Sequence, residues 1–259
     1  MLNKINSSLI GYSILIVLFI IFIPLLTDID PNKQNLMNAL ADFNSSNLLG
    51  TDQYGRDMLT RLAYATRLSF ILAFITMLTA AIPGILLGIF AAYKEGIIEK
   101  ILILISDIIL SLPGLLLVLL LVAFDPGNLL LLYLGLSLSL WVEFFRVTRV
   151  KTKTILVQPY IESTKLLGFS TFYILKKQIL PQLFPILFTL ATFAMSTAII
   201  AISTLSAMGI GLHPPRAELG GMIVEFMPYF DEKVTLILLP SFFIFLLILS
   251  LQLISKRRF

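Results

Sequence analysis

Six long apolar runs, separated by polar segments, constrain this chain more than any other feature of its sequence. They occupy residues 8–26, 67–93, 98–124, 129–145, 183–209 and 234–254. A helix needs about 20 apolar residues to cross the hydrocarbon core of a bilayer. Because every backbone polar group must be paired in lipid, a single run of this kind spans the membrane as a helix. The sequence therefore predicts an all-α membrane protein with six transmembrane helices.

The composition agrees with this prediction and excludes several other classes of protein. Of the 259 residues, 58% are hydrophobic and 13% are charged, whereas soluble domains carry about 45–50% apolar and about 25% charged residues. So high an apolar content excludes an intrinsically disordered chain. The sequence has no Cys and a single His, which excludes a disulfide-stapled secreted domain, a thiolate metal site and a thiol nucleophile.

The first apolar run has to be distinguished from a signal peptide, because Lys4 precedes it. At 8–26 the run is longer than the 7–15 residues of a signal core, and no small-x-small cleavage site follows it. We therefore expect an uncleaved helix. Residues 1–66 then hold this helix and an extracytoplasmic loop or amphipathic helix, and residues 67–259 hold a core of five helices.

The distribution of Lys and Arg predicts the orientation in the membrane. With the N-terminus inside, the inner segments carry 13 of the 19 basic residues and the outer segments carry 6. Cytoplasmic loops of membrane proteins are enriched in Lys and Arg. We therefore expect both termini in the cytoplasm, and the net charge of +4 needs no nucleic-acid partner to explain it.

The fifth run differs in kind from the sixth. Of the 23 residues from 189 to 211, 14 are Gly, Ala, Ser or Thr, against 3 of 21 from 234 to 254. Small residues allow close helix packing in lipid, so we expect an interior fifth helix and a lipid-facing first and sixth helix. Close packing alone and a pore-lining role both fit this pattern. The pore-lining candidates are Ser196, Thr197, Ser203 and Thr204.

The basic segment 146–182 is too patterned for a simple connection. Pro159 suits the first turn of a short helix, and Gly168 suits the position just past its end. Ser170 can cap a second helix that Pro181 would close. Such a cytoplasmic helix-turn-helix either transmits motion to the spans or rests as an amphipathic hairpin on anionic headgroups.

Charged residues before the second run are spaced as ion pairs. Asp52 and Arg56, and likewise Asp57 and Arg61, are separated by four residues, which places each pair on one face of a helix. They indicate an amphipathic helix at the outer surface. By itself this spacing fits an interface helix with snorkelling Arg side chains.

Several of these motifs together resemble a known family. The Glu162…Gly168…Leu180-Pro181 pattern resembles the EAA loop of ABC importer permeases, with Ser163 and Thr164 in place of two alanines. The outer segment resembles the signature of the C-type permease of dipeptide, oligopeptide and nickel importers. Its residues are Leu49-Gly50-Thr51-Asp52-Gln53-Tyr54-Gly55-Arg56-Asp57, Arg61 and Arg67-Leu68-Ser69. Asp107…Pro113 and the stretch from Met208 to Pro215 also resemble that subfamily.

The resemblance implies half of a translocation pore in the bacterial cytoplasmic membrane. Its partners would be a second homologous permease, two cytoplasmic ABC ATPases and an extracytoplasmic solute-binding protein, and its cargo would be peptides, nickel or metal-chelator complexes. The sequence has no Gly-x-x-x-x-Gly-Lys-Ser/Thr loop, so ATP-Mg would bind the partner ATPases, and we expect neither catalysis nor a cofactor on this chain.

The resemblance also assigns roles to particular residues. The residues expected to couple to the ATPases are Pro159, Tyr160, Glu162, Ser163, Thr164, Lys165, Gly168, Leu180 and Pro181. Those expected in an outer contact with the binding protein are Thr51, Asp52, Gly55, Arg56, Asp57 and Arg61.

The ionisable residues near the spans bear on two other functions, an ion-coupled secondary transporter and an intramembrane enzyme. Asp107 lies in a run of 27 residues, roughly 40 Å as a helix, so it can sit near the inner interface, and we expect a structural ion pair with Arg146 or Arg149. An ion-coupled secondary transporter usually has several intramembrane charges, and here only Asp107 and, marginally, Glu143 qualify. An intramembrane enzyme would need a nucleophile with a base, or paired carboxylates. One His and one Asp near the membrane do not meet this requirement.

A metal site is also not expected. The single imidazole, His213, has no Cys to assist it and makes a poor ligand set. We therefore interpret His213 as a turn residue. We expect packing roles for Met195, Met208, Met222 and Met227.

Overall fold

The computed structural model describes residues 30–125, 127–211 and 216–255, and their regular structure is helical. Within these ranges no strand forms, and an isolated β-bridge joins Thr51 to Asp57. The helix predicted at 8–26 and the residue His213 lie outside the described ranges. The longer helices are α2 (Met58–Lys94), α3 (Gly96–Leu110), α4 (Gly114–Val122), α5 (Leu129–Leu156), α8 (Leu180–Ala207) and α10 (Thr235–Ser255). The shorter elements are η1 (Leu36–Asn38), α6 (Pro159–Leu166), α7 (Thr171–Ile174), η2 (Leu175–Ile179), α9 (Leu219–Phe226) and η3 (Met227–Tyr229).

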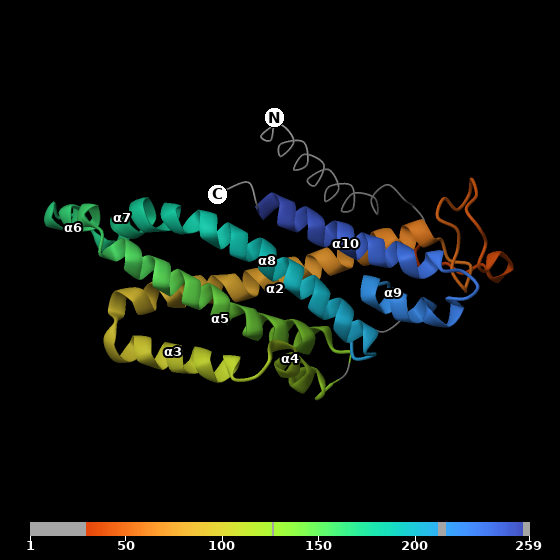
Figure 1. Ribbon diagram of the computed structural model, residues 1–259, viewed down its shortest axis with the longest axis horizontal. Coiled ribbons are helices and arrows are strands. Elements are labelled where there is room, and N and C mark those ends of the chain that lie inside the picture. The colour runs from red at the N-terminus through yellow and green to blue at the C-terminus, as the bar shows by residue number, and fades with distance from the viewer. Residues whose placement is uncertain (1–29, 126, 212–215, 256–259) are drawn as a thin grey trace.

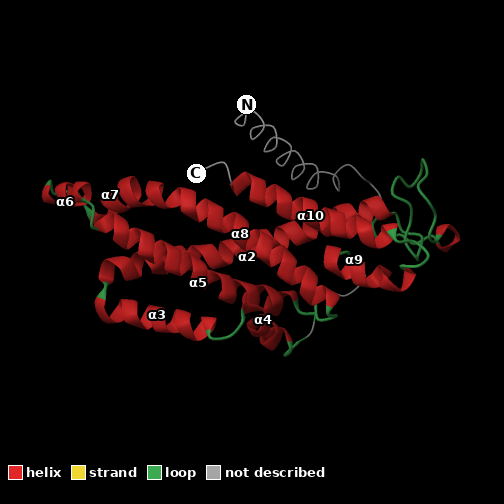
Figure 2. Ribbon diagram, in the orientation of Figure 1, coloured by secondary structure: helices red, strands yellow, loops and turns green. Residues whose placement is uncertain are grey.

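The long helices lie side by side along one axis of the molecule (Figure 1). The short helices α6 and α7 extend from one end, and the segment that precedes α2 lies with α9 towards the other end. Figure 2 shows that most of the loop structure gathers at this second end. The all-α prediction is therefore confirmed for the described residues.

Four described helices are long and apolar enough to cross a membrane: α2, α5, α10, and α8 together with the segment from Thr171. A fifth crossing is made if α3 and α4 count as one broken span, which bends by 78°. The described residues thus account for up to five of the six predicted spans.

The third apolar run is not the single helix that the sequence predicts over 98–124. It breaks between Leu110 and Gly114. Pro113 explains the break, because proline has no N–H to donate and its ring disfavours the helical conformation in the preceding residue. The run therefore forms two half-helices, α3 and α4.

The second and fourth helices are longer than the apolar runs that predict them. α2 begins at Met58 because the Asp57 side chain caps it, accepting a hydrogen bond from the N–H of Thr60. α5 continues past residue 145 to Leu156 through the basic stretch. Lys and Arg are good helix formers, so the hydropathy limit marks where the apolar stretch ends and not where the helix ends.

Close contact between α2 and α5 forms the centre of the fold. A Cβ on Gly84 would lie 2.6 Å from the Cβ of Phe144, and one on Gly88 would lie 2.8 Å from the Cβ of Thr148. Glycine at these two positions lets the helices approach, as small residues do in membrane proteins. The side chains of Trp141 and Phe145 on α5 are buried in the same core.

Burial distinguishes α8 from α10. Half of the most apolar window of α8 is buried inside the chain, against 22% for α10. This agrees with the expected interior position of the small-residue helix and the peripheral position of the last one. α10 therefore exposes an apolar outer surface.

Candidate functional site

The short helix α6 forms the tip of the molecule at one end. Pro159 occupies its first turn, and Gly168 follows its end with φ +81°, a left-handed conformation that glycine adopts without strain. Ser170 caps α7, since its side chain accepts a hydrogen bond from the N–H of Tyr173. These three positions agree with the local structure that the sequence predicts.

Side chains on α6 divide into an anchor and an exposed surface. Ile161 is fully buried in a cluster with Ile174 and Ile179. Leu166, the last residue of α6, and Leu167, which follows it, are 84% and 76% exposed. Thr164 is half-buried, and the other coupling candidates are exposed: Pro159, Tyr160, Glu162, Ser163, Lys165, Gly168, and, at the start of α8, Leu180 and Pro181.

Two hydrogen bonds connect this tip to the base of α8. Gln178 Nε2 donates to Thr164 Oγ1 over 2.8 Å, and Gln182 Nε2 donates to the Tyr160 hydroxyl over 2.8 Å. Two of the predicted coupling residues are thus held by glutamines that the sequence did not single out.

Pro181 does not close the second cytoplasmic helix, contrary to the prediction. α7 passes through the π-helical turn η2 directly into α8, where Leu180 and Pro181 form the first turn. The missing N–H of proline is tolerated in a first turn, and a π-helical turn changes the hydrogen-bond register just before it. The segment from Thr171 is therefore continuous with α8.

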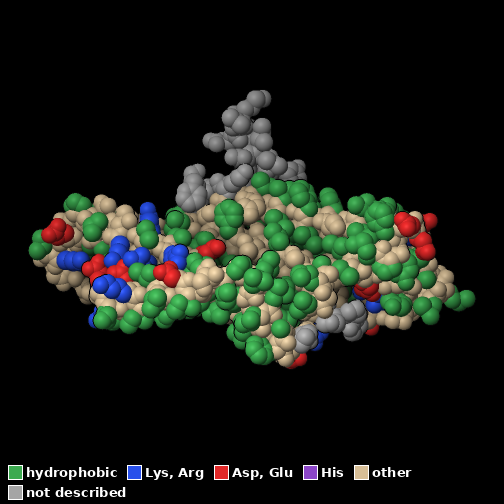
Figure 3. Space-filling view, turned by 60° about the horizontal axis from the view of Figure 1, so that its bottom comes forward, with side chains coloured by type: hydrophobic (Ala, Val, Ile, Leu, Met, Phe, Trp, Pro, Cys, Tyr) green, Lys and Arg blue, Asp and Glu red, His purple; other side chains and the backbone are tan. Residues whose placement is uncertain are grey.

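Ion pairs join α3 to the C-terminal half of α5. Glu99 Oε1 lies 2.5 Å from Arg149 Nη2 and 2.7 Å from Lys153 Nζ, and Lys153 also lies 3.4 Å from Glu95. Figure 3 shows acidic and basic side chains gathered at this end of the molecule. Sequence reasoning missed Glu99, because a charged residue near a helix start has many candidate partners.

The predicted ion pair of Asp107 forms with one of its two candidates. Asp107 pairs with Arg146, and both side chains are about half exposed. Arg149 pairs with Glu99 instead. The helical register explains the difference, since Asp107 lies two turns beyond Glu99 on α3 and Arg146 lies about one turn before Arg149 on the antiparallel α5.

A buried charge cluster lies at the opposite end of α2. Arg61 Nη1 and Arg56 Nε both lie 2.6 Å from Asp52 Oδ2. On the other side, Arg61 Nη2 lies 2.8 Å from Glu225 Oε2 on α9, and Arg56 also pairs with Glu225. Arg61 and Asp52 are completely buried. The two arginines therefore bridge the loop before α2 to α9.

The structure corrects two expectations about this segment. Asp57 caps α2 and does not pair with Arg61, and the predicted surface helix forms only from Met58 on, as the first turns of α2, because Asp52 and Arg56 lie in the loop before it. Arg61 cannot snorkel to water, because it is enclosed between two carboxylates. Sequence reasoning also missed Glu225, which lies 164 residues from Arg61.

Glu225 owes its ionisation to this cluster. Burial alone raises the pKa of its carboxyl, but the charges and hydrogen bonds of Arg61 and Arg56 outweigh burial and hold that pKa below its ordinary value. Gln53 Nε2 donates a further hydrogen bond to Glu225 over 2.9 Å. The carboxyl group of Glu225 is therefore ionised at neutral pH.

The other predicted outer residues hold the loop in shape. The Thr51 hydroxyl bonds to the carbonyl of Asn38 and accepts from the N–H of Ala41 over 2.8 Å. Gly55 has φ +69°, and a Cβ there would lie 1.8 Å from the carbonyl oxygen of Asn35. Five of the six predicted contact residues are buried, and Asp57 is partly accessible.

The pore-lining candidates on α8 separate into two pairs. Ser196 and Ser203 are buried inside the chain, whereas Thr197 and Thr204 are exposed. Ser203 lies 3.3 Å from the carboxylate of Glu218, a buried residue that caps α9 by accepting from the N–H of Gly221. The hydroxyl of Ser203 therefore supports α9.

Metal ligands do not gather in the described part of the chain, where no group of three His, Asp or Glu side chains could hold an ion. Met195 and Met222 are buried in the core, as expected. The packing prediction is wrong for Met208 and Met227, which are more than half exposed, because they lie beyond the packed part of α8 and at the end of α9.

These features define a class: a polytopic membrane protein of apolar helices, with a broken span and an exposed helical tip at one end. The chain belongs to the family of binding-protein-dependent transport system inner membrane components, whose profile matches residues 84–259. This family comprises transport components of the inner membrane, which confirms the resemblance drawn from the motifs.

Several curated relatives are similar over most of the chain. The dipeptide transport system permease protein DppC of Haemophilus influenzae is 31% identical over 96% of this chain and 88% of its own. The di/tripeptide permease protein DppC of Pseudomonas aeruginosa is 30% identical over 94% and 82%. The oligopeptide permease protein OppC of Bacillus subtilis is 28% identical over 83% and 70%.

A solved structure supports the same fold. The inward-facing MetNI methionine ABC transporter is similar with a TM-score of 0.62 and 18% identity, covering 77% of this chain and 95% of that chain. At this identity the likeness concerns the fold alone.

Proposed function

We propose that this chain is the permease subunit of an ATP-driven ABC importer of peptides and forms half of its translocation pore. The exposed tip of α6, with Leu166 and Leu167 in solvent, carries the proposal. Two neighbouring leucines of a cytoplasmic helix rarely stay in water without a partner. A groove on a cytoplasmic ATPase would cover them.

The proposed topology has six membrane helices and both termini in the cytoplasm. Basic residues around α6 and the inner end of α5 support this orientation. ATP-Mg would bind the ATPases, so the role of this chain is mechanical. Of the cargoes that the sequence left open, peptides are favoured over nickel and metal chelates, because three similar proteins are named for peptide transport.

Coupling is proposed to run through α6 into two spans. Movement of the tip would pass to α5, which ends three residues before Pro159, and to α8 through the bonds of Gln178 and Gln182. Closing and separation of the ATPases would thereby open the pore alternately to each side of the membrane.

The binding protein is proposed to dock near the outer charge cluster without touching it. The buried residues Asp52, Arg56 and Arg61 would hold the loop rigid. Direct contacts would then fall to exposed neighbours such as Tyr54 and Met37, which are 43% and 97% exposed.

Reconstitution tests this proposal. The chain with its second permease, ATPases and binding protein should take up a labelled dipeptide only when ATP and binding protein are both present. Glu162→Lys should uncouple ATP hydrolysis from uptake, with Glu162→Gln as the control for charge reversal. Uptake without the ATPases, driven by an ion gradient, would instead establish the alternative, an ion-coupled secondary transporter.

A further inference from the structure

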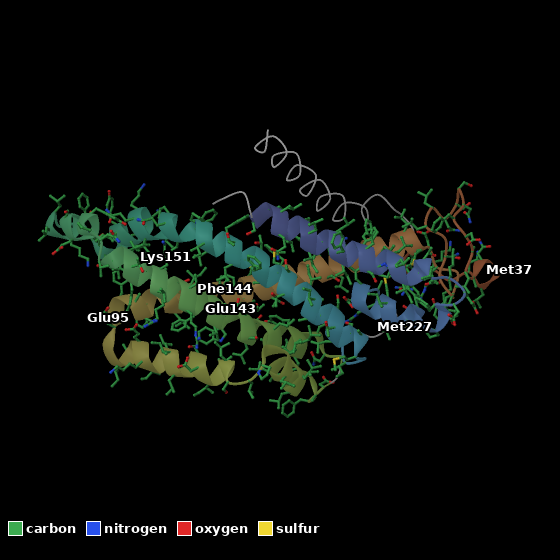
Figure 4. The ribbon with its side chains drawn as sticks, viewed as in Figure 1. Met37, Glu95, Glu143, Phe144, Lys151 and Met227 are labelled. Carbon is green, nitrogen blue, oxygen red and sulfur yellow. The ribbon has the colours of Figure 1, made fainter. Side chains whose placement is uncertain are left out.

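Glu143 is a carboxylate with no partner among the described residues, and it lies in the apolar part of α5, two residues before that part ends at 145. It lies 14 residues after the start of α5 and 13 before its end, about 20 Å from each. Figure 4 shows it between the ends of the molecule marked by Glu95 and Met37. Its side chain is exposed and makes no hydrogen bond or ion pair with any described residue.

Such a residue is not expected to face lipid. A charged side chain within a membrane span is costly, and intramembrane carboxylates almost always face a water-filled cavity or another protein group. The unpaired carboxylate of Glu143 therefore needs water or a cation outside this chain.

The break between α3 and α4 lies beside Glu143. Asp107 on α3 pairs with Arg146, and Gly114 at the start of α4 lies against Ser139, whose Oγ would be 2.5 Å from a Cβ at that glycine. The residues between them in α3 and α4 thus lie beside the turn of α5 that carries Glu143.

The backbone at this break is open. Residues 111–114 are all exposed, and Pro113, at the cap position of α4, provides no side chain to the first N–H groups. Irregular backbone at membrane depth is tolerated only where it is buried in protein or lines a water-filled cavity. This second observation is independent of Glu143 and points to the same side of the molecule.

We propose that this polar face, formed by residues 107, 111–114, 139, 143 and 146, lines the translocation pathway, and that Glu143 contacts protonated amines of the cargo. The proposal rests on the proposed transport function. Arg146 already neutralises Asp107, so the face keeps one uncompensated negative charge at Glu143. That charge favours cationic groups in a passing solute and disfavours anionic ones.

Cysteine labelling tests the location, because the natural chain has no Cys to replace. In the reconstituted transporter, a charged methanethiosulfonate should modify Glu143→Cys at least about tenfold faster than Phe245→Cys. Phe245 is 57% exposed on the peripheral helix α10 and serves as the lipid-facing control. Equal, slow labelling of both variants would overturn the proposal.

The charge of Glu143 is tested with a cysteine placed one helical turn away on α5. In Ser139→Cys the carboxylate of Glu143 is still present, and a cationic reagent should react faster than an anionic one. Adding Glu143→Gln should abolish that preference, whereas Glu143→Asp should keep it. A preference that persists in the Gln variant would show that Glu143 does not set the local potential.

Competition between dipeptides tests the contact with cargo. Glu143→Gln should lower uptake of a Lys-containing dipeptide about fivefold relative to a Glu-containing one, the effect of one close charge pair in water. Equal changes for both peptides, or loss of the second permease from the purified complex, would refute a cargo contact; the latter would assign Glu143 to the subunit interface.

These outcomes are distinct from failure of the proposed function. Labelling requires only the assembled complex. The ATP dependence of wild-type uptake is measured in the same vesicles, so a normal ATP requirement combined with an inert Glu143 would reject this inference alone.

Discussion

The substitution Arg61→Met should destabilise the fold more than any change at an exposed ion pair. Arg61 is completely buried and lies 2.6 Å from Asp52 and 2.8 Å from Glu225. Methionine fills much of the same volume but leaves two buried carboxylates with Arg56 as their remaining cation.

The expected cost follows from this geometry. Removing one partner of a buried ion pair typically costs 3–5 kcal/mol, and the lower end, about 3 kcal/mol, applies here because Arg56 still contacts both carboxylates. Asp52 also accepts from the backbone N–H groups of Tyr54 and Arg56, each over 2.9 Å. These bonds keep the loop partly ordered in the variant.

A double-mutant cycle in detergent measures the coupling. Arg61→Met, Glu225→Gln and the double variant are unfolded with denaturant, and the two single losses should exceed the double loss by about 1–3 kcal/mol. Asp107→Asn is the matched control, because its pair with Arg146 is about half exposed and should be worth less than about 1 kcal/mol. If Arg61→Met lowers the free energy of unfolding no more than Asp107→Asn does, the reasoning is refuted.

Three further outcomes are expected. Because the pKa of Glu225 is lowered in the folded state, its contribution to the free energy of unfolding is full at pH values above the ordinary carboxyl pKa. That contribution is lost as the pH falls through the lowered pKa. Glu225→Gln should therefore flatten the acid-induced loss of stability when the free energy of unfolding is measured against pH. Gly84→Ala should lower the free energy of unfolding by about 1–3 kcal/mol, since its Cβ would lie 2.6 Å from the Cβ of Phe144; an unchanged free energy of unfolding would contradict this packing argument. Leu166→Asp should reduce co-purification of the ATPases without changing the melting temperature, because Leu166 is 84% exposed; a fall in melting temperature would contradict that reasoning.

Local signals in the sequence predict local structure well in this chain. Pro159, Gly168 and Ser170 occupy the helix positions expected of them, because capping and left-handed turns depend on a few neighbouring residues. Hydropathy likewise locates the described apolar helices, since lipid imposes one requirement on all of them.

Long-range partners escape the same reasoning. The i,i+4 rule finds the pair of Asp52 and Arg56 but wrongly joins Asp57 to Arg61. Spacing fixes only which side chains can share a face. The fold decides the outcome by bringing Glu225 from another helix and by using Asp57 as a cap.

The helix ends also show where hydropathy stops being informative. α5 continues for eleven residues beyond the predicted limit at 145, and those residues carry Arg149 and Lys153, which fix α3 through Glu99. Pro113 breaks its span, while Pro83 lies within the continuous helix α2. Flanking residues explain the contrast, because Gly84 allows α5 to pack against α2 at that turn and hold the helix together.

The two charge clusters constrain the bundle at opposite ends. Arg56 and Arg61 fix the start of α2 to α9, and Glu99 fixes the start of α3 to α5. Between these ends Asp107 pairs with Arg146 beside the exposed break at 111–114, while Glu143 has no partner among the described residues. Because Glu99 ties α3 to α5, a displacement at α6 that moves α5 would carry α3 with it, so the Glu99 pairs and the pairs of Arg56 and Arg61 with Glu225 can both stay intact. The position of the unpaired carboxylate thus agrees with a pathway that opens to alternate sides without breaking either set of ion pairs.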